Sequence, residues 1–393
     1  MVFTNTTADI PVTDSALDRK CYSQYDISNY GSTQACATRR EMTVETRGHV
    51  SLHRRAFLAA SASAVAMPFI SRVARAQNKR LIFPTYGGSY QDMVKAAYTD
   101  PFTKETGVEV VFSGVPDFAR LKAQVSAGNV EWDVFDAGGA WFPVGSKEGL
   151  FEPLDPAVIT DKDLVLGERK DYAPFYHTPY GVGWNAGKHN AQNAPKDCAQ
   201  FWDVKKFPGK RSMRARADFV LEIALVADGV DPARLYPLDV NRALKSLEKL
   251  KPSVPKWADS TSQLVTLLTT NEVDFDYLPN GRVRATIGSP APLAINLDQT
   301  FLSHEYIGVV KGTPRKDVAM RFVAFCLRPD RQAAFAEMIS YLPGNPRAMD
   351  LVSAEGKKWL PDVSSKHHIV QNDDWWAVEF AAVQQRFQEF LLT

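Results

Sequence analysis

The sequence has little of the one-sided charge, the cysteine or the long apolar runs that mark several classes of protein. Its 393 residues carry 46 Lys and Arg against 45 Asp and Glu, for a formal net charge of +1. A nucleic-acid partner requires a dominant basic field, so this balance argues against that class. Four cysteines in so long a chain exclude a disulfide-dense mini-protein. A single apolar run is long enough to discuss as a membrane segment, which excludes a protein with many spans.

Common catalytic and metal-binding motifs are absent as well. The sequence contains no H-E-x-x-H, no Cys-x-x-Cys and no G-x-S-x-G. The stretch before Lys188 is not a phosphate loop, because Val182 stands where glycine is needed and His189 replaces Ser or Thr. His367 and His368 are adjacent and share no helix face, so they make a poor metal pair. We therefore expect no catalytic residues, no metal and no cofactor.

The first 76 residues indicate export. Arg54 and Arg55 begin a charged stretch that is followed by a short Ala- and Ser-rich run at 59–70 and by an A-x-A site ending at Ala76. The arginine pair resembles a twin-arginine export signal. An uncleaved anchor is the alternative, but the run is shorter than the roughly 20 residues that span a membrane. We expect a disordered extension and signal over 1–76, cleavage near Ala76 and a periplasmic product; Met42 is an alternative start to Met1.

Two cysteines remain in the exported part. Cys21 and Cys36 precede the cleavage site, whereas Cys198 and Cys326 follow it. The compartment permits disulfides, but a pair forms only if the fold brings the two residues together. A bridge and two buried thiols therefore both stay open.

Strands and helices alternate along the exported chain. A strand over 81–83 is followed by a turn and by a helix that starts at Ser89, through an S-x-x-D pair with Asp92, and ends at Gly107. A strand over 108–112, a helix over 118–125 ended by Gly128 and a strand over 132–135 follow. This order predicts βαβ units in an α/β protein. Ligands bind beyond the carboxyl ends of such strands, here at 86–89 and 136–141.

The remainder of the chain repeats this order. We expect a strand-to-helix unit over 210–227, helices around 243–247 and 264–268, and a segment at 276–282 that returns to a strand over 291–297. Helices over 317–327, 330–339 and 375–392 complete the chain. Its length suggests two lobes, at about 150 residues each.

Several stretches, taken in order, resemble the exported solute-binding proteins of spermidine/putrescine-type ABC transporters. They are YGGSYQD at 86–92, PYGVGWN at 179–185, FWDVKKFPGK at 201–210, NGR at 280–282 and YLPGN at 341–345. The resemblance implies a two-lobed, type II-like periplasmic binding protein fold, with a mixed sheet flanked by helices in each lobe and a ligand cleft between them. It assigns 77–184 plus 281–328 to the first lobe and 185–280 plus 329–393 to the second.

The same resemblance implies function. A monomer would capture one small solute and deliver it to the permease subunits and ATPase of an ABC importer, without catalysis. Hinge closure around the ligand would prepare it for delivery. A ligand-sensing receptor subunit and an exported enzyme on the same scaffold are the alternatives.

Two kinds of residue are candidates for ligand contact. Gly88, Ser89 and Tyr90 begin a helix whose first N–H groups are free to bind an anionic group. Aromatic side chains in turn-rich connections can stack on a ligand, with core packing as the alternative for each; these are Tyr86, Trp141, Trp184 and Trp257. The resemblance adds Asn280 and Arg282, which follow a crossing strand.

The departures from the family pattern concern charge. Polyamine binders carry acidic residues at the strand-to-helix turn of the second lobe, where this sequence has Arg214 and Arg216. Pro279 replaces an expected Trp, and Arg282 adds further positive charge. Arginine presents a planar fork that suits a carboxylate or phosphate. We therefore predict a ligand with an anionic group, with the alternative that Arg214 and Arg216 face solvent or pair with surface acids.

Overall fold

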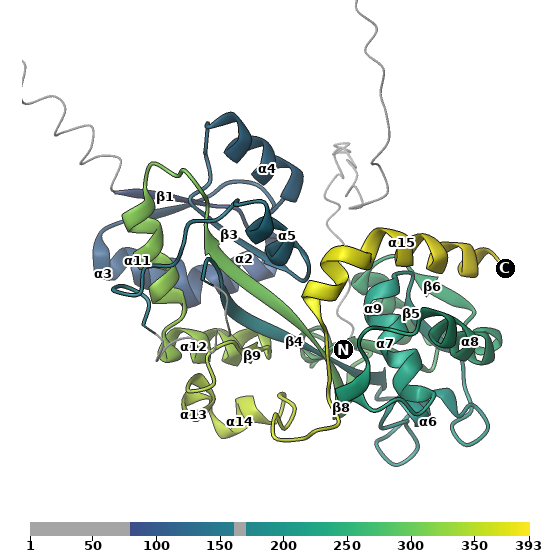
Figure 1. Cartoon of the computed structure of the whole chain (residues 1–393). Helices are drawn as coiled ribbons and strands as arrows, with labels where there is room; N and C mark the ends of the chain where they lie inside the picture. The colour runs from purple at the N-terminus through teal and green to yellow at the C-terminus, as the bar shows by residue number, and fades with distance from the viewer. Residues whose placement is uncertain (1–78, 161–169) are drawn as a thin grey trace, which may run out of the picture. The chain divides into compact units, whose positions relative to one another are not determined.

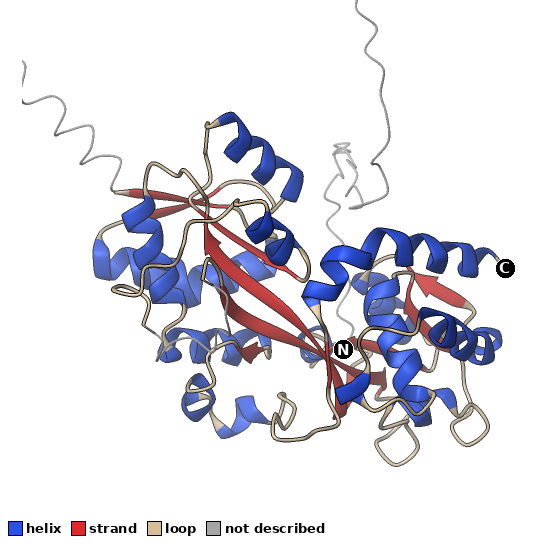
Figure 2. Ribbon diagram, in the orientation of Figure 1, coloured by secondary structure: helices blue, strands red, loops and turns tan. Residues whose placement is uncertain are grey.

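The computed structural model describes residues 79–160 and 170–393, all of which belong to the unit formed by residues 63–393. Helices flank the strands of a mixed α/β fold, which confirms the predicted fold class (Figure 2). Within the described ranges, no helix combines the length and apolar character that crossing a membrane requires. The predicted export signal, its cleavage site and Cys21 and Cys36 lie outside the described residues.

The first lobe begins with a βαβ unit. Strands β1 (Arg80–Phe83) and β2 (Glu109–Phe112) pair in parallel, and a helical segment connects them as α2 (Gly88–Val94), η1 (Lys95–Thr99) and α3 (Asp100–Thr106). Helix α4 (Phe118–Ala127), strand β3 (Val134–Gly138) and helix α5 (Trp141–Lys147) follow. The helices end at Gly107 and Gly128, as predicted. Ile82 N donates to Oδ2 of Asp133 and Asp133 N donates to the Ile82 carbonyl oxygen, which ties β1 to the residue before β3.

Two long antiparallel strands form the centre of the larger sheet. They are β4 (Ala173–Asn185) and β8 (Leu293–Val309), and both contribute to the two lobes (Figure 1). The sheet order is β10-β8-β4-β7-β5-β6, with β3 also paired to β8 and β9 to β4. The register shifts between Tyr180 and Val182. A Cβ atom on Gly181 would lie 2.2 Å from the carbonyl oxygen of Asn296, so only glycine permits this crossing.

The second lobe surrounds the other end of this sheet. Its strands are β5 (Arg211–Arg214), β6 (Lys256–Ala258) and β7 (Phe275–Pro279), which run parallel to one another. Its helices are α6 (Cys198–Trp202), α7 (Ala217–Ala227), η3 (Pro232–Arg234), α8 (Val240–Leu250), η4 (Lys251–Ser253), α9 (Thr261–Thr269) and α10 (Asn280–Arg284).

The last part of the chain returns to both lobes. It contains α11 (Lys316–Cys326), α12 (Pro329–Ile339), β9 (Leu342–Pro343), α13 (Ala348–Leu351), α14 (Ala354–Lys357), β10 (Ile369–Val370) and α15 (Asp373–Leu392). The three helices predicted here are therefore present. Phe335 and Ile339 of α12 pack in the first-lobe core with Tyr98, whereas Phe387 of α15 packs in the second-lobe core. The lobe boundaries drawn from the resemblance stay a prediction.

The two cysteines of the exported chain lie in different cores. Cys198 packs in the second-lobe core and Cys326 in the first-lobe core, and both are buried free thiols. Because the fold keeps them in separate cores, no disulfide joins them.

Candidate ligand-binding site

A chain of tyrosine hydroxyls ends on a buried carboxylate in the first lobe. The hydroxyl of Tyr176 donates to Tyr90 at 3.1 Å, and the hydroxyl of Tyr90 donates to Oδ2 of Asp136 at 2.8 Å. Tyr86 lies beside Tyr90, with ring centroids 5.5 Å apart. Asp136 stands in β3, near the strand end where the sequence predicted ligand binding. The residues after β1 and in β3 therefore meet, as expected of neighbouring strands.

Two acidic groups in this region lack a cation. Asp136 is fully buried, its Oδ1 has no partner, and burial raises its pKa to about 7. Oε2 of Glu305 on β8 is also buried without a partner. Burial raises the pKa of Glu305, and the charges of Asp136 and Asp373 raise it further. Over 79–160 and 170–393, neither Asp136 nor Glu305 forms an ion pair with Lys or Arg.

The backbone brings the Glu305 carboxylate close to β3. Gly138 is paired with Glu305 in the sheet, and a Cβ atom at position 138 would lie 2.8 Å from Oε1 of Glu305. Glycine at position 138 therefore leaves the space that the carboxylate occupies.

The positive side of the site comes from residues 214–218, which run from the last residue of β5 into the start of α7 and which we call the arginine loop. Nη1 of Arg214 donates to Oγ1 of Thr261 at 3.0 Å, and its Nε is buried without a partner. Arg216 pairs through Nε with Oδ1 of Asp218 at 2.5 Å. The side chain of Asp218 is only 14% exposed. Arg216 thus pairs with an acid of its own loop while its own side chain is 44% exposed, which agrees in part with the alternative that it faces solvent and pairs with an acid.

A strained residue follows the arginine loop. Phe219 has a φ of 79°, although it carries a bulky side chain, and Asp218 is also non-helical. Its ring is held at centroid distances of 4.9 Å from Tyr180 and 5.0 Å from Phe301. Such backbone strain persists only where the surrounding packing enforces it, and it concentrates at functional sites.

The charges of Arg214 and Glu305 both influence the pKa of Tyr180. Burial raises the pKa of its phenol, the charge of Arg214 lowers it, and the charge of Glu305 raises it. Burial likewise raises the pKa of Tyr341, which is also influenced by Tyr180, Arg282 and Glu305. The charge of Glu305 therefore acts on both tyrosines, that of the arginine loop on Tyr180 and that of Arg282 on Tyr341. This region also holds the partnerless Nε of Arg214 and Oε2 of Glu305, and we take it as the candidate ligand-binding site.

The three predicted tryptophans pack in or against the cores. Trp184 is 3% exposed in the second-lobe core, and Trp257 packs against Phe387 and Phe390 of α15. Trp141 packs against Phe118 and Phe135, with ring centroids 5.8 and 6.3 Å apart. This is the core-packing alternative weighed for each of them, and ligand contact by these rings stays a prediction.

The remaining predicted residues differ in their surroundings. Asn280 is fully buried, its amide donates to the carbonyl groups of Ser340 and Trp359, and its Oδ1 accepts from Gly281 N. Helix α2 begins at Gly88, and Gly87 at its N-cap position has no side chain. The first N–H groups of this helix, including that of Ser89, therefore have no side-chain cap. Anion binding at Gly88 and Ser89 stays a prediction.

The sequence patterns did not indicate three members of the site, namely Tyr176, Tyr180 and Glu305, and they indicated Asp136 only as part of a segment. Asp136 begins the 136–141 segment that the strand pattern had marked for ligand binding. Tyr180 belongs to the PYGVGWN stretch, which we did not assign to a strand. Glu305 lies in the half of β8 beyond residue 297, where polar residues interrupt the apolar pattern that had predicted a strand.

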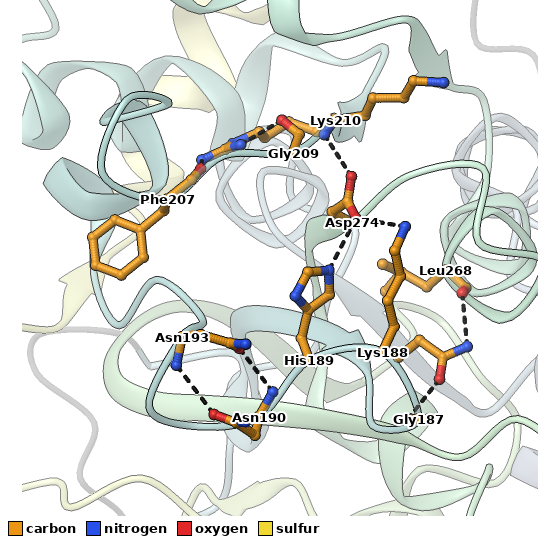
Figure 3. A network of polar contacts seen from close by, with 12 residues as sticks. Gly187, Lys188, His189, Asn190, Asn193, Phe207, Gly209, Lys210, Leu268 and Asp274 are labelled. Atoms are coloured by element: carbon orange, nitrogen blue, oxygen red, sulfur yellow. Dashed lines mark hydrogen bonds and ion pairs between the residues drawn. The ribbon is translucent and has the colours of Figure 1, made fainter.

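A second polar network lies at the amino ends of β5 and β7, away from the arginine loop at the carboxyl end of β5 (Figure 3). Oδ1 of Asp274 accepts from Lys188 at 2.7 Å and from His189 at 2.9 Å, and Oδ2 accepts from Lys210 N at 2.7 Å. Burial acts to raise the pKa of Asp274, but these hydrogen bonds lower it to about 2. Because the arginine loop follows the carboxyl end of β5, this network stabilises the second lobe away from the ligand-binding residues.

Comparison with known proteins agrees with this architecture. Residues 97–361 match the family model of bacterial extracellular solute-binding proteins. The gamma-aminobutyric acid (GABA)-binding protein of Pseudomonas aeruginosa is 32% identical, over 86% of this chain and 97% of its own length. The spermidine/putrescine-binding periplasmic protein of Escherichia coli K12 is 25% identical, over 74% of this chain and 85% of its own length.

A solved structure described as the Atu4243–GABA receptor is 32% identical, with a TM-score of 0.72, and covers 79% of this chain and 97% of its own. These relatives are binding proteins and receptors, not enzymes. The predicted resemblance to polyamine-type solute-binding proteins is thereby confirmed. On its fold and on the match over 97–361, the chain belongs to the bacterial extracellular solute-binding proteins of the ABC transporter family.

Proposed function

We propose that the protein captures a small zwitterionic solute of the GABA class, which carries a carboxylate at one end and an ammonium group at the other. The observation that carries this proposal is the set of buried atoms without a partner, which are Nε of Arg214 on the positive side and Oδ1 of Asp136 and Oε2 of Glu305 on the acidic side. A site with positive charge on one side and unpaired acidic groups on the other suits a ligand of two opposite charges. GABA-binding relatives with 32% identity support the same class.

The carboxylate of the ligand would bind at the arginine loop. Arg214 is half-buried with its Nε fully buried, and burial lowers the pKa of its guanidinium, which reflects the electrostatic cost of this position. An anionic ligand supplies the missing negative charge, and the planar guanidinium can bind a carboxylate through two nitrogens. Arg282, which acts on Tyr341, adds positive charge nearby.

The ammonium group would bind at Asp136 and Glu305. A buried carboxyl group without a cation is costly in its charged form, so a ligand cation in this region is stabilised by the pairing. The rings of Tyr86, Tyr90 and Tyr176 offer apolar and cation–π surface beside it. A polyamine would satisfy the acidic side but would place a second cation at the arginines.

The wider role follows from the family. The protein would be exported, cleaved near Ala76, and act as a periplasmic monomer that closes on its solute and delivers it to the permease and ATPase of an ABC importer. Periplasmic relatives support this location. Amino-terminal sequencing of the exported protein tests the cleavage position, and light scattering of residues 77–393 tests the monomer.

A ligand panel tests the proposal directly. Thermal shift and calorimetric titration of residues 77–393 would compare GABA with butyrate, butylamine, putrescine and spermidine. We expect GABA to raise Tm, because it binds only the native state. Butyrate and butylamine each lack one charge and should bind at least tenfold more weakly, which corresponds to about 1.4 kcal/mol. Tight binding of putrescine or spermidine would contradict the proposal.

A further inference from the structure

The carboxy-terminal helix α15 forms hydrogen bonds with the backbone of the arginine loop. Drawn in yellow in Figure 1, it packs against α5, α7 and α8. Oε1 of Gln384 accepts a hydrogen bond from Ala217 N at 2.8 Å, and Nε2 of Gln388 donates to Ala215 O at 3.2 Å. These two glutamines, four residues apart on one face of the helix, therefore bind the backbone on both sides of Arg216.

The contact with Gln384 fixes the backbone of a stretch that is not helical. Asp218 and Phe219 have non-helical backbone angles, so the regular part of α7 begins only after Phe219. Arg216, which precedes α7, makes no side-chain cap bond of its own. The side-chain oxygen of Gln384 therefore holds the backbone at Ala217, next to Arg216.

The guanidinium of Arg216 is also oriented by α15. It lies over the ring of Phe380, with its carbon atom 5.3 Å from the ring centroid. The bond to Asp218 engages Nε and leaves the two Nη atoms to other acceptors. Phe380 covers one face of the plane and Asp218 holds one edge, so the free edge has a defined direction.

Helix α15 is itself anchored in both lobes. Asp373 accepts from the hydroxyl of Tyr306 on β8 at 2.9 Å, next in sequence to Glu305. Trp376 donates to Oε1 of the buried Glu222 on α7 at 2.6 Å, and Lys251 donates to the Phe390 carbonyl at 2.6 Å. A helix fixed at both ends is a rigid support for the loop.

We infer that Gln384 and Phe380 are positioning residues, which act through Arg216 to set the carboxylate-binding side of the site. This inference rests on the proposed function for the identity of the ligand but not for the support of the loop. Neither side chain needs to touch the ligand for its replacement to weaken binding, because a misdirected guanidinium loses its bond to the carboxylate.

The test compares Gln384→Met, which keeps the length of the side chain and removes the acceptor, with Gln384→Glu, which restores an acceptor oxygen. Gln385→Met, at an exposed neighbouring position paired with Glu389, is the matched control. Phe380→Leu is a second variant that keeps an apolar side chain and removes the ring. All are made in residues 77–393 and measured well below Tm.

Two measurements are needed. Hydrogen exchange of the peptide covering 214–219, without ligand, should accelerate about fivefold in Gln384→Met and stay unchanged in the control. The Kd for GABA should rise about fivefold in Gln384→Met and in Phe380→Leu, and Gln384→Glu should restore it. Unchanged exchange in Gln384→Met, or faster exchange with an unchanged Kd, would overturn the positioning role. Failure of the wild-type protein to bind GABA would instead contradict the proposed ligand, so the two failures are distinct.

Discussion

The hydroxyl of Tyr90 donates a 2.8 Å hydrogen bond to Oδ2 of Asp136, while Oδ1 of the same carboxyl group has no partner. This contact joins helix α2 to the middle of β3. It also leaves half of a buried carboxyl group available to a ligand. Since burial raises the pKa of Asp136 to about 7, its charge changes close to neutral pH.

Binding of GABA should strengthen as the pH rises. Asp136 is protonated below its pKa of about 7 and charged above it, and only the charged form pairs with an ammonium group. We expect the Kd measured by calorimetry to fall about tenfold between about pH 6 and pH 8, because one group passes through its titration. Asp136→Asn should flatten this dependence. A Kd that stays constant over the range in the wild-type protein would contradict the role of Asp136.

Replacement of Arg214 should select against carboxylate ligands. Arg214→Gln removes the charge and keeps a polar side chain beside Thr261. We expect the Kd for GABA to rise more than about tenfold, since a charge-assisted bond is lost, while binding of putrescine is not weakened. Arg234→Gln, at an exposed position in η3, is the control. An equal loss of affinity for GABA and putrescine would show that the substitution disturbs the fold, and would contradict a specific bond between Arg214 and the carboxylate.

Asp274 should matter for stability and not for binding. Its pKa is lowered to about 2, so its contribution is present above its unfolded pKa near 4 and is lost as the pH falls toward 2. The shift corresponds to about 2 kcal/mol of the free energy of unfolding at neutral pH. Asp274→Asn should therefore lower Tm by a few degrees at neutral pH and leave the Kd for GABA unchanged. Denaturant titration at about pH 7 and pH 3 checks the sign, because the difference between the two proteins should shrink in acid.

The two cysteines of the exported chain should be inert in the native protein. Cys198 is buried against the hydroxyl of Tyr277, and burial raises its pKa to about 12. Burial also raises the pKa of Cys326. The thiolate is the reactive form of cysteine. A thiol reagent should therefore label neither cysteine in the folded protein (residues 77–393) and both cysteines after unfolding in guanidinium chloride. Rapid labelling of the native protein, or an absence of thiols after unfolding, would contradict this prediction.

Local patterns predicted much of the secondary structure. The helix ends at Gly107 and Gly128, the strand-to-helix unit at the arginine loop and the three late helices all follow from spacing and turn residues within a few positions. Strand β4 and the second half of β8 were not predicted. Their polar residues interrupt the apolar pattern, because these residues contact the sheet and the site. Segments whose environment is mixed carry no clear periodicity.

Local sequence also did not predict the surroundings of the aromatic residues at the site. Tyr86 and Trp257 both stand in turn-rich sequence, yet Tyr86 lies beside Tyr90 whereas Trp257 packs under α15. Asn280 follows a crossing strand as expected, but its amide binds two backbone carbonyl groups. Burial and hydrogen-bond partners depend on distant segments, so neither could be predicted from neighbouring residues.

The sequence by itself determined the alternation of strands and helices, the family, and the presence of arginines where polyamine binders have acids. Only the tertiary structure decided that Asp136 and Glu305, separated by 169 positions along the chain, stand together without a cation, and that Gln384 supports the loop that carries Arg216. The physical reason is that local propensity depends on near neighbours. Charge complementarity depends instead on distances that the crossing of β4 and β8 and the return of α15 create.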